Sequence, residues 1–129
     1  MKPEWQLWFE FAERDLRACQ KLLEGELCAN ACFHAQQAVE KALKGLLLYR
    51  GKTAPKTHSL PELFVLLKEP ALASYRDVID VLNKYYIPTR YPDLIEGDEP
   101  SWFSDVNEAR NALAQAREVA ETVFAIAKP

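Results

Sequence analysis

The sequence predicts an all-α protein, an up-and-down bundle of four main helices plus one short helix. Apolar residues recur at spacings of three and four along the predicted helices, and no segment shows the alternation of a strand. Glycine or proline separates consecutive patterns, and the early connections are short. The chain has 129 residues, of which 49% are apolar, and this suits one helical domain over residues 1–129 with a real core.

The central element is segment 30–51, the longest helical pattern without a proline. Gly51 is placed to end it in the left-handed conformation. One face is expected to pack in the core, and it carries Cys32, Ala35, Val39, Ala42, Leu43, Leu46 and Leu47. The other face is expected to present a polar row, His34, Gln37, Lys41 and Lys44. Within this helix Glu40 is expected to pair with Lys44, one turn further on.

The first helix is predicted over residues 3–24. Pro3 suits a helix start, and Gly25 is expected to end the helix in the left-handed conformation. The apolar stripe comprises Trp5, Trp8, Phe9, Ala12, Leu16, Cys19, Leu22 and Leu23. The short connection to segment 30–51 predicts that these two helices pack antiparallel as a hairpin.

A loop over residues 52–58 leads to the short helix. Ser59 and Glu62 fit a capping box, in which Ser59 is the N-cap and Glu62 reaches back to it. The helix is expected to continue to about Lys68, where the pattern stops before Pro70.

Two further helices complete the predicted bundle. The first covers about 72–85, with an apolar face of Tyr75, Val78, Ile79, Leu82 and Tyr86. The second begins at Ser104 or Asp105 and runs to Ala127. Its stripe comprises Val106, Ala109, Leu113, Ala116, Val119 or Ala120, Val123 and Ala127.

The net charge of −3 is close to neutral, which argues against a dedicated nucleic-acid coat protein. The charge is uneven, because segment 30–60 carries five bases and one acid, whereas segment 91–109 carries six acids and no lysine or arginine. A local basic surface is therefore predicted. The N-terminus does not resemble a signal peptide and no apolar stretch could span a bilayer, so a cytoplasmic protein without a membrane partner is expected.

Few residues suggest catalysis or metal binding. There is no glycine-rich phosphate loop, no histidine pair at metal-binding spacing and no nucleophile elbow, so no catalytic residue, metal or cofactor is predicted. Cys19, Cys28 and Cys32 are expected to be buried as small apolar residues. The acidic run IEGDEP (95–100) is interpreted as a solvated loop, with a divalent-cation site as the alternative.

The two histidines and one arginine are the candidate binding groups. His34 is either a surface residue bonded to a neighbour or a direct ligand contact, and His58 either packs at a helix entry or bonds backbone. Arg90 lies between tyrosines in a loop stiffened by two prolines, YYIPTRYPD. Arg90 and Tyr91 could bind a phosphate and a base. Equally, Arg90 could pair with Asp93 or with a helix C-terminus while Tyr91 fills the edge of the core.

The stretches FHAQQAVEKALKGLLLYRG, KTHSL and PTRYPD resemble the HEPN family of helical nucleotide-binding domains. The resemblance covers nearly the whole chain. It implies a four- or five-helix bundle that binds a nucleotide or RNA and forms a homodimer. Many members are encoded beside a minimal nucleotidyltransferase protein, and such pairs often act as toxin–antitoxin modules.

Many HEPN proteins are metal-independent ribonucleases, in which an arginine is followed after four to six residues by a histidine. This sequence departs from that motif. No histidine follows Arg90 or Arg110, and seven residues separate Arg50 from His58. No imidazole is therefore placed as in the motif to activate a ribose hydroxyl, and the resemblance favours binding without catalysis.

The resemblance implies a binding site formed by two parts of the chain. In the central helix it falls on His34, Gln37, Glu40, Lys41 and Lys44, and in the loop on Thr89, Arg90, Tyr91, Pro92 and Asp93. The loop is expected to fold over the polar row and form a shallow groove. In that groove Arg90 and Lys41 would bind phosphate, and Tyr91 would stack on or border the base. His34 and Gln37 would bond to sugar or base edges.

Three hypotheses remain open from the sequence. The first is a non-catalytic nucleotide- or RNA-binding dimer that works with a nucleotidyltransferase. The second is a metal-independent ribonuclease with a displaced site that pairs Arg90 with His34 or His58. The third is a scaffold that only holds its partner.

Overall fold

The computed structural model describes residues 1–86 and 105–127 of the chain. Within these ranges there is no strand, and the predicted all-α class is confirmed. The elements are α1 (Glu4–Glu24), α2 (Cys28–Tyr49), α3 (Leu60–Leu67), the 3₁₀ helix η1 (Pro70–Tyr75), α4 (Arg76–Asn83) and α5 (Val106–Ile126).

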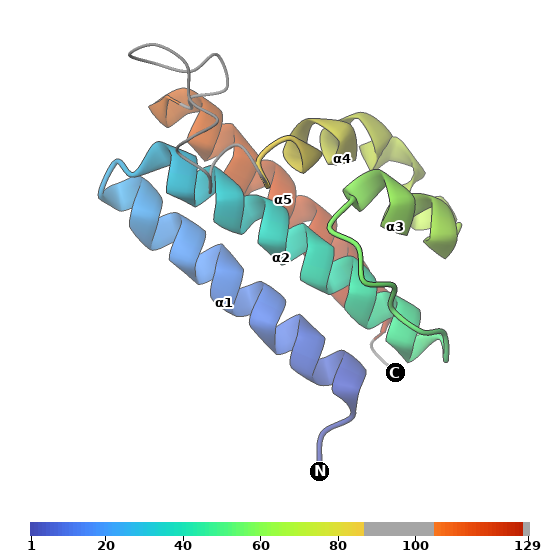
Figure 1. Cartoon of the computed structure of the whole chain (residues 1–129). Helices are drawn as coiled ribbons and strands as arrows, with labels where there is room; N and C mark the ends of the chain where they lie inside the picture. The colour runs from blue at the N-terminus through green and yellow to red at the C-terminus, as the bar shows by residue number, and fades with distance from the viewer. Residues whose placement is uncertain (87–104, 128–129) are drawn as a thin grey trace.

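Helix α2 is the centre of the bundle, as the sequence predicts. It contacts α1, α3, α4 and α5, and Figure 1 shows it between α1 on one side and α3 and α4 on the other. The C-terminal half of α2 lies against the start of α1, since Gly45 lies against Phe9. The predicted antiparallel hairpin of the first two helices is therefore confirmed.

The predicted apolar stripes of α2 and α5 form much of the core, and buried residues of α1, α3, η1 and α4 complete it. All seven apolar residues expected on the inner face of α2 are buried, as is the α5 stripe from Ala109 to Ala127. The three cysteines are buried thiols, as expected. Burial raises the pKa of the Cys19 thiol from its ordinary value of 9.0 to about 12, so this thiol stays protonated at alkaline pH values where an exposed thiol ionises.

The end of α1 differs from the prediction. Gly25 has a φ of −86°, and Glu26 takes the left-handed conformation instead, with a φ of 58°. The reason lies in the hydrogen bonds that close the helix: Leu27 N–H donates to Leu22 O, and Glu26 N–H donates to Leu23 O. This closing motif needs the left-handed residue one position after Gly25. At the end of α2 the same motif places Gly51 at φ 76°, as predicted.

The start of α3 confirms half of the predicted capping box. Ser59 Oγ accepts a hydrogen bond of 3.2 Å from the backbone N–H of Glu62. The backbone N–H of Ser59, which a full capping box gives to the glutamate, donates instead to Thr57 Oγ1 at 3.1 Å. The preceding threonine therefore takes the role that the sequence assigns to the glutamate.

The predicted helix over 72–85 is wrong in its first part, which is the 3₁₀ helix η1. Glu69 Oε2 accepts from the N–H of Ala71 at 3.3 Å, so this turn starts two residues before the predicted helix. The apolar face also shifts at its end. Tyr85 is the buried tyrosine and its hydroxyl donates to Glu108 Oε1 at 2.5 Å, whereas Tyr86 is only half-buried.

Helix α5 begins after Asp105, one of the two predicted starts. Asp105 Oδ1 accepts from the N–H of Glu108 at 2.7 Å and so caps the helix. In the described ranges no helix combines the length and the apolar character needed to cross a membrane.

Candidate functional site

The polar side of α2 is covered in its middle, and this differs from the prediction of an open row. Lys44 and Glu40 are buried, with side chains 8% and 4% exposed. They pair at 3.2 Å, which confirms the predicted bond between them. The Lys44 ammonium also lies 5.7 Å from the centre of the Trp8 ring. The prediction that Lys44 faces solvent is wrong because α1 contributes this ring over it.

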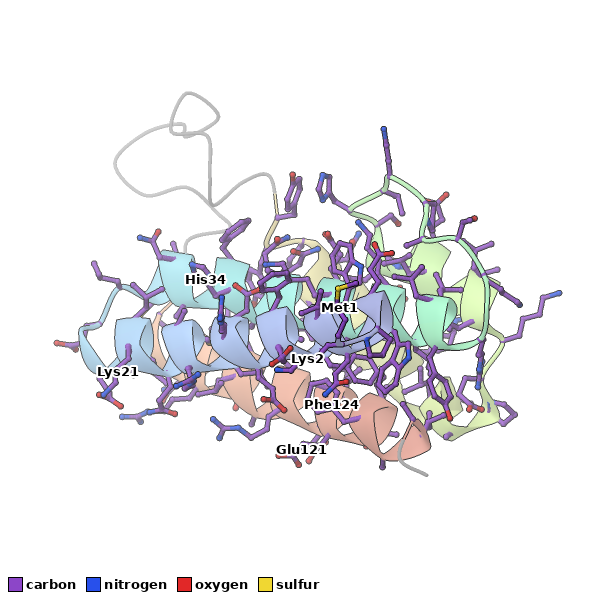
Figure 2. The ribbon with its side chains drawn as sticks, turned by 90° about the horizontal axis from the view of Figure 1, so that it is seen from below. Met1, Lys2, Lys21, His34, Glu121 and Phe124 are labelled. Carbon is purple, nitrogen blue, oxygen red and sulfur yellow. The ribbon has the colours of Figure 1, made fainter. Side chains whose placement is uncertain are left out.

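A second buried carboxylate, on α1, holds two of the predicted binding residues together. Asp15 Oδ1 lies 2.8 Å from His34 Nδ1, and Asp15 Oδ2 accepts from Lys41 Nζ at 2.6 Å. Figure 2 shows His34 where α1 and α2 meet. Because an ionised carboxylate can only accept, Nδ1 of His34 carries the hydrogen.

Glu40 holds the other imidazole in a similar way. Its Oε1 atom lies 3.1 Å from His58 Nδ1 and accepts from the Gln37 amide at 3.3 Å. The buried Gln36 amide donates to the backbone carbonyl of His58 at 3.1 Å. The loop before α3 is thereby tied to the polar side of α2, and His58 covers Glu40.

A group of rings extends between the two imidazoles. His58 and Tyr86 are stacked, with centroids 4.2 Å apart and planes 15° apart. Phe33 lies 5.9 Å from Tyr86 and 5.3 Å from the ring of His34. We call these four residues, Phe33, His34, His58 and Tyr86, the ring cluster.

The two carboxylate–imidazole pairs have a common chemistry. Each imidazole turns Nδ1 to a buried carboxylate, so the neutral ring keeps a lone pair on Nε2 for a ligand. Neither Nε2 atom has a hydrogen-bond partner among residues 1–86 and 105–127. The side chain of His34 is 32% exposed and that of His58 is 52% exposed, so both are accessible.

Most of the positive charge of segment 30–60 is neutralised. Lys41 pairs with Asp15, Lys44 with Glu40, and Arg50 with Glu69 at 2.7 Å. The predicted basic surface is thereby reduced to two exposed lysines, Lys52 and Lys56.

The remaining predicted binding residues, Arg90 and Tyr91, lie outside the described residues. The same holds for the acidic run 95–100. The groove predicted between the loop and α2 therefore stays a prediction. In the part of the chain that the structure describes, no three His, Cys, Asp or Glu side chains are grouped to hold a metal ion.

Comparison with known families identifies the chain. The family model described as the HEPN domain matches residues 5–126. The chain belongs to the HEPN family. Two solved structures are similar over nearly their whole length. TT1696 from Thermus thermophilus is 38% identical with a TM-score of 0.86, and the match covers 96% of this chain and 98% of TT1696.

The second structure is ST0689, described as an archaeal HEPN homologue. It is 31% identical with a TM-score of 0.80, and the match covers 98% of this chain and 100% of ST0689. The search of curated proteins finds no match. The helical bundle described above is thus the HEPN fold, and the ring cluster and its two carboxylates are features of this HEPN chain.

Three members of the site, Asp15, Phe33 and Tyr86, were not identified as site residues from the sequence. Asp15 occupies a position in the apolar stripe of α1, between Ala12 and Cys19 at spacings of three and four. A charged residue at such a position is a signal of a buried ion pair. The contact of His58 with Tyr86 has no such signal, because it joins two segments that are distant in sequence.

Proposed function

We propose that this HEPN protein is a non-catalytic binder of a nucleotide or RNA, and that it acts as a cytoplasmic homodimer with a minimal nucleotidyltransferase in a toxin–antitoxin module. The observation that carries the binding role is the pair of carboxylate-held imidazoles in the ring cluster. Such a surface offers flat rings for a base and fixed hydrogen-bonding groups for a sugar. The family membership supports the same class of ligand.

The proposal assigns a role to each site residue. His34 and Gln37 bond to sugar or base edges. Lys41 contributes to phosphate binding, since its side chain is 26% exposed and its ammonium group has three donors, of which Asp15 takes one. Arg90 completes the phosphate site and Tyr91 stacks on or borders the base; they follow Tyr86 in sequence by four and five residues.

The charge of the described site favours a small or single-stranded ligand. Three of its basic side chains are already paired with carboxylates, so few cations remain to neutralise a run of backbone phosphates. Binding to a duplex depends strongly on such cations. A free nucleotide or a short unpaired RNA segment suits this surface better.

Nucleotide binding is tested by titration with ATP, which is monitored by thermal shift and by amide NMR. We expect ATP to raise the melting temperature of the wild type and to shift resonances of α2. Arg90→Ala should lose most of the affinity, whereas the control Arg110→Ala, at an exposed position of α5, should bind like the wild type. Equal binding by Arg90→Ala and wild type would show that the assigned phosphate role is wrong.

The partner and the dimer need separate measurements. Light scattering after gel filtration should give twice the mass of the 129-residue chain. Co-purification with the product of the neighbouring gene should capture a nucleotidyltransferase. A protein that captures this partner and binds neither ATP nor RNA would be the scaffold.

A second function is favoured by the orientation of the imidazoles. A carboxylate on Nδ1 fixes an imidazole and leaves Nε2 able to take a proton, which is the requirement for a general base acting on a ribose hydroxyl. A ribonuclease of this kind would cleave RNA in EDTA. Cleavage should then be lost in His34→Ala or His58→Ala, whereas RNA that stays intact during long incubation with the wild-type dimer would exclude this function.

A further inference from the structure

We propose that His58 is the stacking surface for a nucleobase, and that the exposed lysines of the same loop, Lys52 and Lys56, bind the phosphates of that nucleotide. The proposal rests on the nucleotide binding proposed above and assigns it a second set of contacts. The ligand class is a nucleoside di- or triphosphate, with a purine favoured because its two fused rings offer the larger stacking face.

His58 is fixed although it lies in a loop. Its Nδ1 atom is 3.1 Å from Glu40 Oε1, its carbonyl accepts from the buried Gln36 amide, and Tyr86 stacks on one face of its ring at 4.2 Å. A side chain that is held before binding loses little conformational entropy when a ligand arrives. The loop residue therefore has the rigidity that a binding surface needs.

The second face of the imidazole is where we place the base. Among the described residues, Tyr86 is the only ring in contact with His58, and the His58 side chain is 52% exposed. A base that stacks on this second face would continue the stack that Tyr86 begins. Aromatic side chains and histidine are common stacking partners of unpaired bases, because every base has a flat π-face. The Nε2 edge stays available for a hydrogen bond to the same ligand.

The loop also supplies the free positive charge of this region. Lys52 and Lys56 are exposed, and neither side chain has an ion-pair or hydrogen-bond partner within residues 1–86 and 105–127. In contrast, Lys41 and Lys44 are paired with buried carboxylates. A phosphate gains more from an ammonium group without a partner than from one that a carboxylate already neutralises. Lys56 precedes His58 by two residues, which suits one ligand that contacts both.

The experiment compares ATP with inorganic triphosphate by calorimetry. The variants are His58→Ala, His58→Phe and Lys56→Gln, with Lys21→Gln on α1 as the control, whose side chain is 80% exposed. His58→Ala should bind ATP about tenfold more weakly or worse and bind triphosphate like the wild type, because only ATP carries a base. His58→Phe keeps a flat ring and should retain the affinity for ATP within a factor of about three. Lys56→Gln should weaken both ligands.

A structural readout separates stacking from loss of the loop. Binding of ATP should shift the His58 ring protons upfield, and binding of triphosphate should not. His58→Ala that binds ATP as tightly as the wild type overturns the proposal. If that variant binds normally while Arg90→Ala does not, the proposed function stands and only the role of His58 is wrong. A wild type that binds neither ATP nor RNA removes both.

Discussion

Gly45 of α2 lies directly against the ring of Phe9 on α1. A methyl group on Gly45 would lie 2.6 Å from both Phe9 Cδ1 and Phe9 Cε1, and 3.1 Å from the carbonyl oxygen of Trp5. The two distances to the ring are well below van der Waals contact, and the distance to the carbonyl oxygen is tight. The glycine therefore permits the close approach of the two helices, and this explains its place inside a helix, where glycine costs about 1 kcal/mol relative to alanine.

Gly45→Ala should lower the free energy of unfolding by about 1–3 kcal/mol, because the added methyl group overpacks the helix crossing. Urea unfolding followed by circular dichroism measures the change. Gly25→Ala is the matched control, since a methyl group there would have no atom closer than 3.7 Å and the φ of −86° suits alanine. A Gly45→Ala protein as stable as the wild type would contradict this account of the crossing.

Glu26→Gly should stabilise the protein by about 1 kcal/mol, because a residue with a side chain is strained in the left-handed conformation. The φ of Glu26 is 58°. Gly51→Ala, at φ 76°, should have the opposite effect of similar size. Thermal melting of the two variants should therefore move in opposite directions. Two shifts of the same sign would mean that the closing turns of α1 and α2 are not equivalent.

Glu40→Gln should destabilise the protein more than Asp15→Asn does. Loss of the Glu40 charge leaves Lys44 buried without a counter-ion, at a cost of about 3–5 kcal/mol. Loss of the Asp15 charge costs about 1–3 kcal/mol, because Lys41 and His34 can turn to solvent. Denaturant unfolding at neutral pH compares the two variants.

The double variant Glu40→Gln/Lys44→Met tests the cause of that difference. It removes the buried ammonium group and should recover about 1–4 kcal/mol of the loss in Glu40→Gln. If the double variant is no more stable than the single one, the loss of stability comes from the broken contact between Glu40 and His58, and not from the charge of Lys44.

Alkaline pH should destabilise the protein through Cys19. The pKa of this buried thiol is raised from 9.0 to about 12, so the folded state holds the proton more tightly than the unfolded chain. The stabilising contribution is complete below pH 9. It is lost as the pH rises toward 12, at up to about 1.4 kcal/mol per pH unit.

Urea midpoints at pH 8, 9, 10 and 11, in a reducing buffer, measure this effect. Cys19→Ala should lose stability less steeply over this range than the wild type. Some alkaline loss should remain in the variant, because burial and the bond to Glu108 also raise the pKa of Tyr85. Parallel curves for the two proteins would rule out the thiol as the source.

The fold was largely predictable because its helices are specified by local pattern. The inner face of α2, from Cys32 to Leu47, is buried as its spacing predicts. Asp105 caps α5 and Ser59 caps α3, and both are recognisable by residue type and position. Where the prediction failed, at Gly25 and in η1, the backbone bonds that decide the conformation have no unique residue signature.

The candidate site was predictable only in part, because burial depends on segments that are distant in sequence. The pairing of Glu40 with Lys44 follows from their spacing, whereas their burial requires His58 and Trp8 to lie over them. His34, Gln37 and Lys41 do share one side of α2, and each bonds to one of the two buried carboxylates. Their ligand is still a prediction, as are the roles of Arg90 and Tyr91.

His58, the residue that covers Glu40, lies in the connection before α3 and not in one of the long helices. If residues 52–83 separate from α2, the charges of Glu40 and Lys44 become solvated. The contacts among α1, α2 and α5 do not depend on this segment and remain. Residues 52–83 are therefore expected to open before the packing of α1, α2 and α5 is lost. Amide hydrogens of α3 and α4 should exchange with deuterated solvent sooner than those in the middle of α2.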